Sequence, residues 1–267
     1  MSWWLLSYLA LGLFSGFVAG LLGVGGGAVM VPILTMLFAA QGFPDTEVLH
    51  LALGTSMATI IFTSVSSARA HHAHGAVLWP VVRAIAPGIV IGTLAASQFA
   101  VRIPTRPLAA FFCAFILYVA VQMMLNIKPK PSRELPGALG MTSAGLVIGG
   151  VSALVAIGGG SLSVPFMAWC NVQVQKAIAT SAAIGFPIAL AGTVGYLIGG
   201  YGHPGLPAGS VGFVFLPALA IMLVASMLTA PIGARLAHRL PVRTLKRIFA
   251  GVLVVLAGKM AWGLFGG

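Results

Sequence analysis

Long apolar runs, interrupted by short polar or glycine-rich segments, fill almost the whole chain. About 20 helical residues cross the roughly 30 Å hydrocarbon core of a bilayer, because each residue of an α-helix rises about 1.5 Å. Cut to that length, the chain yields apolar pieces at residues 3–22, 28–40, 50–68, 77–99, 107–127, 137–157, 161–170, 177–200, 210–234 and 244–263. The pattern therefore predicts an all-α polytopic membrane protein.

The last five pieces repeat the first five in hydropathy and in sequence. One motif, Gly25, Gly26, Gly27, Ala28 and Pro32, is matched at identical spacing by Gly158, Gly159, Gly160, Ser161 and Pro165. A second motif, Thr55 and Ser56, is matched by Thr180 and Ser181. Between these repeats, residues 128–136 form a polar linker rich in Lys and Pro. We therefore expect a first transmembrane repeat at 1–127, a cytoplasmic linker at 128–136 and a second transmembrane repeat at 137–267.

The basic residues give an orientation, because Lys and Arg mark cytoplasmic loops. If residues 69–74 are cytoplasmic, alternate crossings leave only a few charged residues outside: Arg102, Arg106, Lys259, Asp45 and Glu47. This orientation puts both termini outside and requires each broken pair, 3–40 and 137–170, to return to its own face as a helical hairpin. The two repeats are then inverted in the membrane, as in many secondary transporters.

Composition narrows the class of protein. Hydrophobic residues make up 59% of the chain and charged residues 6%, which excludes an ordinary soluble domain. The net charge of +11 does not indicate nucleic-acid binding, because the basic residues punctuate apolar runs and do not cluster on one polar face. Cys113 and Cys170 stand at apolar positions and are expected to be free and buried. The expected partners are a small anionic substrate and membrane lipid, with a homo-oligomer left open.

The glycine-rich breaks carry the strongest chemical signal. Non-helical backbone is tolerated at membrane depth only where protein buries it or where it lines a watery cavity. A helix restarting at Ala28 or Ser161 would direct unpaired N–H groups and its positive dipole end at an internal site, which suits an anion. The alternative is that these glycines only allow close helix packing, as Gly12, Gly16 and Gly20 are expected to do.

Hydroxyl side chains could add donors to the same site. The candidates stand in the opening turns of matching pieces: Thr55, Ser56, Thr180 and Ser181. Such hydroxyls also bond to helix carbonyls in membranes, and that role is about as plausible for each residue alone. Their duplication favours the site.

Other kinds of site are disfavoured. The acidic residues, Asp45, Glu47 and Glu134, lie outside every piece, so a carboxylate proton relay or sodium cage is not expected. A dinucleotide fingerprint at 23–28 lacks the strand–helix context that would give it meaning. One cluster, Arg69, His71, His72 and His74, is interpreted as a cytoplasmic loop, because the scattered remaining histidines could not complete a metal centre. We predict no cofactor, metal site or catalytic residue.

The chain resembles the TauE/SafE family of sulfite exporters over nearly its whole length. The resemblance lies in GLLGVGGGAVMVPIL at 20–34, LALGTSMATIIFTSVSSARAHHAHGAV at 51–77, ALVAIGGGSLSVPFM at 153–167 and ATSAAIGFPIALAGTVGYLIGG at 179–200. It implies an inner-membrane transporter for sulfite, organosulfonates or related sulfur-containing anions. It also implies that the matched Gly, Thr, Ser and Pro positions surround the substrate.

The expected function is therefore secondary transport of a small sulfur-containing anion, most readily as export, by alternating access. Two alternatives stay open at this point. An anion channel could use the same glycine-rich cradle, and a membrane enzyme would need a bound metal or cofactor.

Overall fold

Helices make up almost all of the computed structural model, which describes residues 2–23, 25–125, 133–237 and 242–265. The helices are α1 (Ser2–Leu22), α2 (Gly27–Ala40), α3 (Val48–Ala73), α4 (Trp79–Ala100), α5 (Thr105–Leu125), α6 (Ala138–Val155), α7 (Gly160–Trp169), α8 (Val174–Gly199), α9 (Leu216–Ala237) and α10 (Val242–Phe265). Seven of them, α1, α3, α4, α5, α6, α8 and α9, are long and apolar enough to cross a membrane. The prediction of an all-α polytopic membrane protein is confirmed.

The three remaining helices differ from the seven for physical reasons. At about 1.5 Å per residue, α2 and α7, with 14 and 10 residues, reach about 21 and 15 Å, less than the thickness of a bilayer core. The 24 residues of α10 would reach across, but this helix carries Arg243, Lys246, Arg247 and Lys259. Each of the seven carries at most one Lys or Arg, so the four charges of α10 set it apart.

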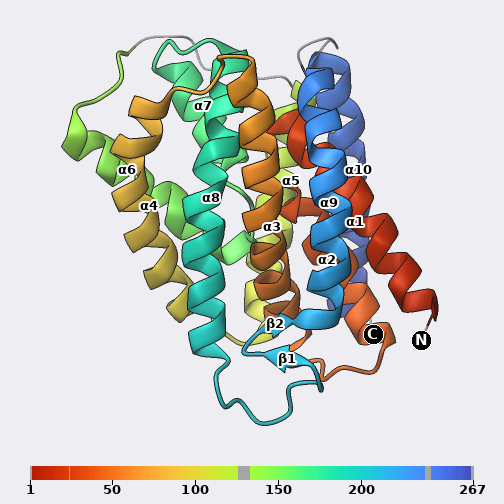
Figure 1. The fold of residues 1–267 in the computed structure, drawn as a ribbon. Coiled ribbons are helices and arrows are strands. Elements are labelled where there is room, and N and C mark those ends of the chain that lie inside the picture. Colours follow the sequence, from red (N-terminus) through yellow and green to blue (C-terminus); the bar gives the residue numbers. More distant parts are fainter. Residues whose placement is uncertain (1, 24, 126–132, 238–241, 266–267) are drawn as a thin grey trace.

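Both short helices return toward the end of the bundle from which their hairpins start (Figure 1). The chain leaves α1 near residue 23, turns, and runs back through α2 until the Gln41 amide donates a hydrogen bond to the Tyr8 hydroxyl of α1. The α6–α7 pair does the same at the opposite end. We call the two ends the β-hairpin end, where both termini lie, and the linker end, which includes residues 74–78.

The centre of the bundle is the antiparallel pair α3 and α8. Thr55, near the start of α3, contacts Phe215, which follows α8, while Thr180, near the start of α8, contacts Leu78, which follows α3. Around this pair, α1 packs on α9, and α6 packs on α4. In the sequence repeat, α6 corresponds to α1, and α9 corresponds to α4. The contact of α6 with α4 is therefore the counterpart of the contact of α1 with α9, and the packing follows the repeat.

Glycine stripes let these outer pairs approach closely. A Cβ on Gly16 would lie 2.4 Å from the Ser226 carbonyl oxygen, and one on Gly20 would lie 2.0 Å from that of Ala230. The predicted packing role of Gly12, Gly16 and Gly20 is confirmed, because each would clash with α9 if it carried a side chain. Cys113 and Cys170 are free and buried, as predicted.

The structure corrects the expected loop at residues 69–74. Helix α3 continues to Ala73, so Arg69, His71 and His72 lie in its last turns, and only His74 belongs to the turn that follows. His71 is buried, with Nε2 3.2 Å from the Gly20 carbonyl oxygen. Basic and imidazole side chains suit a helix C-terminus, which extends the helix beyond the apolar run that defined the prediction.

A second correction concerns the expected helix at 210–234. Residues 210–215 form a small antiparallel hairpin, β1 (Ser210–Val211) and β2 (Val214–Phe215), with Ser210 opposite Phe215. Gly209 and Gly212 have positive φ angles of 90° and 51°, which an L side chain rarely adopts and a helix excludes. Helix α9 therefore starts only at Leu216.

Parts of two predictions lie outside the described residues. The linker at 128–136 is described only from residue 133, so Lys128 and Lys130 are not placed. The same holds for His238 and Arg239 in the basic segment before α10.

Candidate substrate site

The two glycine-rich breaks share one backbone geometry. Gly26, directly before α2, has φ 77° and ψ −11°, and Gly159, directly before α7, has φ 80° and ψ −14°. Both are in the left-handed region, which costs an ordinary L-residue roughly 1–2 kcal/mol. The chain also turns left-handed where the preceding helices end, at Gly23 (φ 68°) and at Ala156 (φ 45°). Both breaks therefore use backbone conformations that L-residues rarely adopt.

The two breaks touch one another inside the bundle. A Cβ on Gly25 would lie 2.6 Å from the Gly158 Cα, and a Cβ on Gly27 would lie 1.6 Å from the Ala156 carbonyl oxygen. The Ile60 side chain, in the middle of α3, would lie 3.4 Å from a Cβ on Gly25 and 3.0 Å from one on Gly27. Segments 129 to 133 positions apart in the sequence thus meet at the central turns of α3, with no room for side chains between them.

Each helix that follows a break begins with unpaired donors. The N–H groups of Leu162 and Ser163 bond to the Gly159 carbonyl, as those of Val29 and Met30 bond to the Gly26 carbonyl. The N–H groups one and two positions earlier, in Gly160, Ser161, Gly27 and Ala28, find no acceptor among the described residues. Two helix N-termini with their positive dipole ends therefore start beside the junction of the breaks.

A cavity of about 10 Å³ lies at this junction. Its walls come from both breaks and from the middle of α3 and α8: Ala19, Gly23, Gly25, Thr63, Ser64, Ser67, Gly158, Ala182 and Gly185. This volume holds about one water molecule, so an oxyanion does not fit in this conformation. The Ser67 Oγ is buried and has no hydrogen-bond partner among the described residues. The cavity is narrow, and the Ser67 hydroxyl is its unused polar group among the described residues.

The structure gives most of the predicted hydroxyl donors other partners. Thr55 Oγ1 accepts the Phe215 N–H at 3.0 Å, Thr180 Oγ1 accepts the Leu78 N–H at 3.0 Å, and Ser181 donates to the Gly23 carbonyl at 2.7 Å. Thr55 and Thr180 therefore tie opposite ends of the α3–α8 pair to the segments before α9 and α4. Ser56 Oγ is buried without a partner among the described residues.

The remaining predicted residues lie along the short helices. Ala28, Pro32 and Ser161 are buried within one or two turns of the helix starts, while Pro165 in α7 is half-buried. Of the predicted glycines, Gly25 contacts Gly158 directly across the repeats, and Gly27 contacts Ala156 beside it. The others are arranged around that contact or at its two ends.

Sequence reasoning missed the hydroxyls that line the cavity, which are Thr63, Ser64 and Ser67. A signal was available, because Ser56, Thr59, Thr63 and Ser67 recur at three- and four-residue spacing and so share one face of α3. All four are buried. Thr59 and Thr63 bond to carbonyls one turn earlier in α3, whereas Ser56 and Ser67 have no partner among the described residues.

Wider cavities open toward each end of the bundle. At the β-hairpin end, a vestibule of about 1080 Å³ lies between α2, the start of α3, the α4–α5 turn and α10. Toward the linker end, a pocket of about 550 Å³ lies between α3, α4 and α8, with Arg69 and Arg83 in its wall. Among the described residues, no group of three His, Cys, Asp or Glu side chains could hold a metal ion. The narrow junction thus lies between two larger cavities.

Apolar spans, two broken hairpins and an internal polar junction define a class, the polytopic α-helical membrane transporters. The chain belongs to the sulfite exporter TauE/SafE family, whose model matches residues 8–260. The resemblance seen in the sequence is confirmed.

Curated relatives cover the chain almost completely. A probable membrane transporter protein of Haemophilus influenzae is 35% identical over 253 residues, which are 94% of this chain and 96% of the relative. The probable membrane transporter proteins YunE of Bacillus subtilis and MJ0441 of Methanocaldococcus jannaschii are 27% and 25% identical, over 96% and 93% of this chain and 97% and 92% of their own lengths. No solved structure matches the chain. These relatives support a transporter.

Proposed function

We propose that this protein is a secondary transporter that exports a small sulfur-containing oxyanion, sulfite or a sulfonate, across the inner membrane by alternating access. The observation that carries the proposal is the contact between Gly25 and Gly158, which joins the two glycine-rich breaks beside two helix N-termini. It supports a single internal anion site built equally from both repeats. The family's description as sulfite exporters supports the class of substrate.

Neutral donors suit such a carrier. Backbone N–H groups and the Ser67 hydroxyl can replace part of the hydration shell of an anion without a fixed positive charge that would hold it too firmly. The junction is closed to an oxyanion while wider cavities lie toward both ends, which is the arrangement of an occluded carrier between two open states. A small opening movement of either hairpin would connect the junction to one side.

The β-hairpin end is proposed to face outward, with both termini external. The basic residues support this orientation, because Arg69, Lys176 and Arg235 all lie near the linker end, where a cytoplasmic face would concentrate positive charge. No enzymatic reaction is proposed.

The direct test is uptake of labelled sulfite into proteoliposomes containing the purified protein. Wild-type protein is expected to transport sulfite with saturation, and Gly26→Leu and Gly159→Leu to stop transport, because both positions need a left-handed backbone. Gly258→Leu is the matched control, since a Cβ at this exposed glycine of α10 meets nothing within 4 Å. Normal transport by folded Gly26→Leu and Gly159→Leu proteins would show that the site lies elsewhere.

The same vesicles separate the carrier from an anion channel. A carrier saturates with substrate and exchanges labelled for unlabelled anion, whereas a channel sustains a current that follows the membrane potential. The cavity of about 10 Å³ at the junction favours the carrier.

A further inference from the structure

The vestibule at the β-hairpin end gathers charges from distant parts of the chain. Its wall includes the three basic residues that the orientation leaves outside, Arg102 and Arg106 from the α4–α5 turn and Lys259 from α10. Asp45 and Glu47 lie in the same wall. Among the described residues, the one ion pair here joins Glu47 to His203 at 3.8 Å. The three basic side chains thus have no carboxylate partner within that part of the chain.

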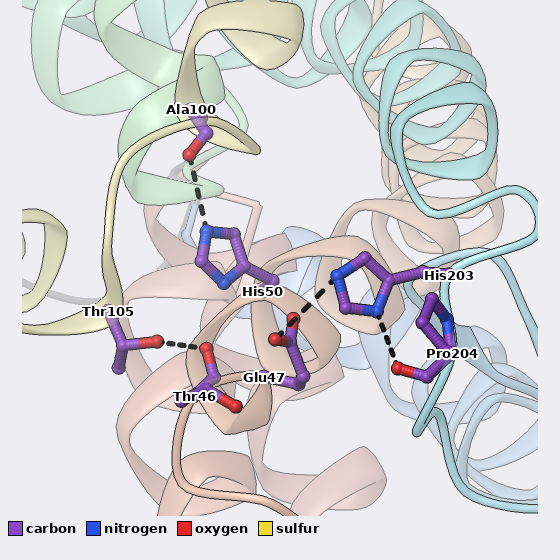
Figure 2. A network of polar contacts seen from close by, with 7 residues as sticks. All are labelled: Thr46, Glu47, His50, Ala100, Thr105, His203 and Pro204. Atoms are coloured by element: carbon purple, nitrogen blue, oxygen red, sulfur yellow. Dashed lines mark hydrogen bonds and ion pairs between the residues drawn. The ribbon is translucent and has the colours of Figure 1, made fainter.

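His50 is the buried polar group of this vestibule. It lies in the first turn of α3, is 3% exposed, and its Nε2 is 3.2 Å from the Ala100 carbonyl oxygen. A carbonyl only accepts, so Nε2 must carry a hydrogen and donate it. His50 Nδ1 is buried and has no hydrogen-bond partner among the described residues (Figure 2). It is therefore a free site for one proton.

His203, the second histidine of the vestibule, differs from His50 in the acceptors beside its ring nitrogens. Its Nδ1 is 3.0 Å from the Pro204 carbonyl oxygen and its Nε2 faces the Glu47 carboxylate, so both ring nitrogens face acceptors (Figure 2). An imidazolium satisfies both. The ring of Phe213 lies between the two histidines, 5.2 Å from His50 and 5.6 Å from His203. Only His50 thus offers an unused nitrogen.

We propose that the vestibule binds one oxyanion together with one proton, with His50 Nδ1 as the proton acceptor and Arg102, Arg106 and Lys259 as the attracting charges. Once protonated, His50 donates to the anion through Nδ1 while keeping its Nε2 bond to Ala100. The inference rests on the proposed function and adds its coupling ion, a proton carried by histidine and not by a carboxylate of the spans.

The charged surroundings fix the sign of the pH dependence. The groups that face the vestibule from the elements around His50 are Asp45, Glu47, Arg102, Arg106, His203 and Lys259. Burial of His50 and the three basic residues oppose a proton on the imidazole, while the two acids favour it, and a bound anion neutralises the opposing charges. Binding of the anion therefore raises the affinity for the proton, and binding of the proton raises the affinity for the anion. The affinity for the anion falls as the pH rises through the histidine range.

The test measures anion binding to the purified full-length protein in detergent by titration calorimetry between pH 5.5 and 8. Ethanesulfonate is used beside sulfite, because its sulfonate group stays ionised in this range and any proton taken up belongs to the protein. Repeating each titration in two buffers of different ionisation enthalpy gives the protons bound per anion. We expect uptake approaching about one proton and an affinity loss of up to about tenfold per pH unit at the alkaline end.

Two glutamine variants distinguish the role of His50 from that of His203. His50→Gln can still donate to Ala100 but cannot take a proton, so proton uptake and the pH slope should disappear. His203→Gln is the matched control and should keep both. If His50→Gln fails to stay monodisperse, the wild-type titration decides alone, and the exposed Arg106→Gln should weaken binding about tenfold with proton uptake unchanged.

Several results overturn the proposal. Anion binding without proton uptake, or proton uptake that persists in folded His50→Gln, would show that His50 is not the proton acceptor. Neither result would contradict the proposed transport. Unchanged anion affinity in Arg106→Gln would show that the basic residues do not attract the anion. Proton uptake with phosphatidylglycerol but not with ethanesulfonate or sulfite assigns the vestibule to a lipid headgroup. No binding of either anion at any pH overturns the proposed function and the inference with it.

Discussion

The two central helices, α3 and α8, share a framework but differ in chemistry. His71 Nε2 faces the Gly20 carbonyl at 3.2 Å, and at the matching place the Tyr196 hydroxyl donates to the Ala153 carbonyl at 2.9 Å. Toward the junction, however, α3 presents Ser64 and Ser67 where α8 presents Ala182 and Gly185. The framework is repeated in both central helices, while the hydroxyl side chains of the cavity wall all come from α3.

The largest expected effect comes from the contact between the breaks. In Gly27→Ala the new Cβ would lie 1.6 Å from the Ala156 carbonyl oxygen, so backbone must move and the hairpins must separate. We expect at least about 3 kcal/mol of destabilisation and no sulfite uptake. Thermal unfolding and proteoliposome uptake measure both. Gly258→Ala, in open space on α10, should change neither, and a stable, active Gly27→Ala protein would contradict the observed packing.

A smaller and equal effect is expected at both ends of the α3–α8 pair. Thr55→Val and Thr180→Val keep the side-chain shape but remove the acceptor of the Phe215 and Leu78 N–H groups. Each should cost about 1–2 kcal/mol, because a buried donor is left unpaired. Chemical unfolding of the two variants compares the ends directly. A large loss in one and none in the other would break the correspondence between the repeats.

At the cavity hydroxyl of Ser67 we expect a loss of anion affinity without a loss of stability. Ser67→Ala removes a group without a partner in the structure, so stability should stay level while the anion affinity falls about tenfold, the loss of one hydrogen bond to a charged ligand. Ser152→Ala is the matched control, because Ser152 Oγ is also buried and unpartnered among the described residues but does not line the cavity. Equal affinity losses in both would remove Ser67 from the site.

The smallest effect is expected at Tyr196. Tyr196→Phe loses only the hydrogen bond to Ala153 and should destabilise the protein by about 1 kcal/mol or less, as typical for bonds within membrane bundles. Tyr201→Phe, at a site that is 87% exposed, should leave the unfolding temperature unchanged. A loss in Tyr201→Phe as large as that in Tyr196→Phe would contradict a stabilising role for the bond between Tyr196 and Ala153.

The hairpins and their meeting place could be predicted because glycine clusters and piece lengths are local properties of the sequence. The partners of the hydroxyls could not, since Thr55 and Ser67 look alike along α3 and differ only in what lies opposite them. The vestibule was equally hidden, because Arg102 and Lys259 stand 157 positions apart and appeared only as exceptions to the charge rule. The β1–β2 hairpin was missed because its strands have two residues each.

The proposed transport requires that the two glycine-broken hairpins start from opposite faces of the membrane. Single cysteines test this most directly when placed at His74, at the linker end, and at Tyr201, at the β-hairpin end, in a protein whose Cys113 and Cys170 are replaced by alanine. Labelling of intact cells with a membrane-impermeant thiol reagent should modify the cysteine at 201 and leave the one at 74 unmodified until the membrane is opened. Modification of both from the same side would contradict the inverted arrangement.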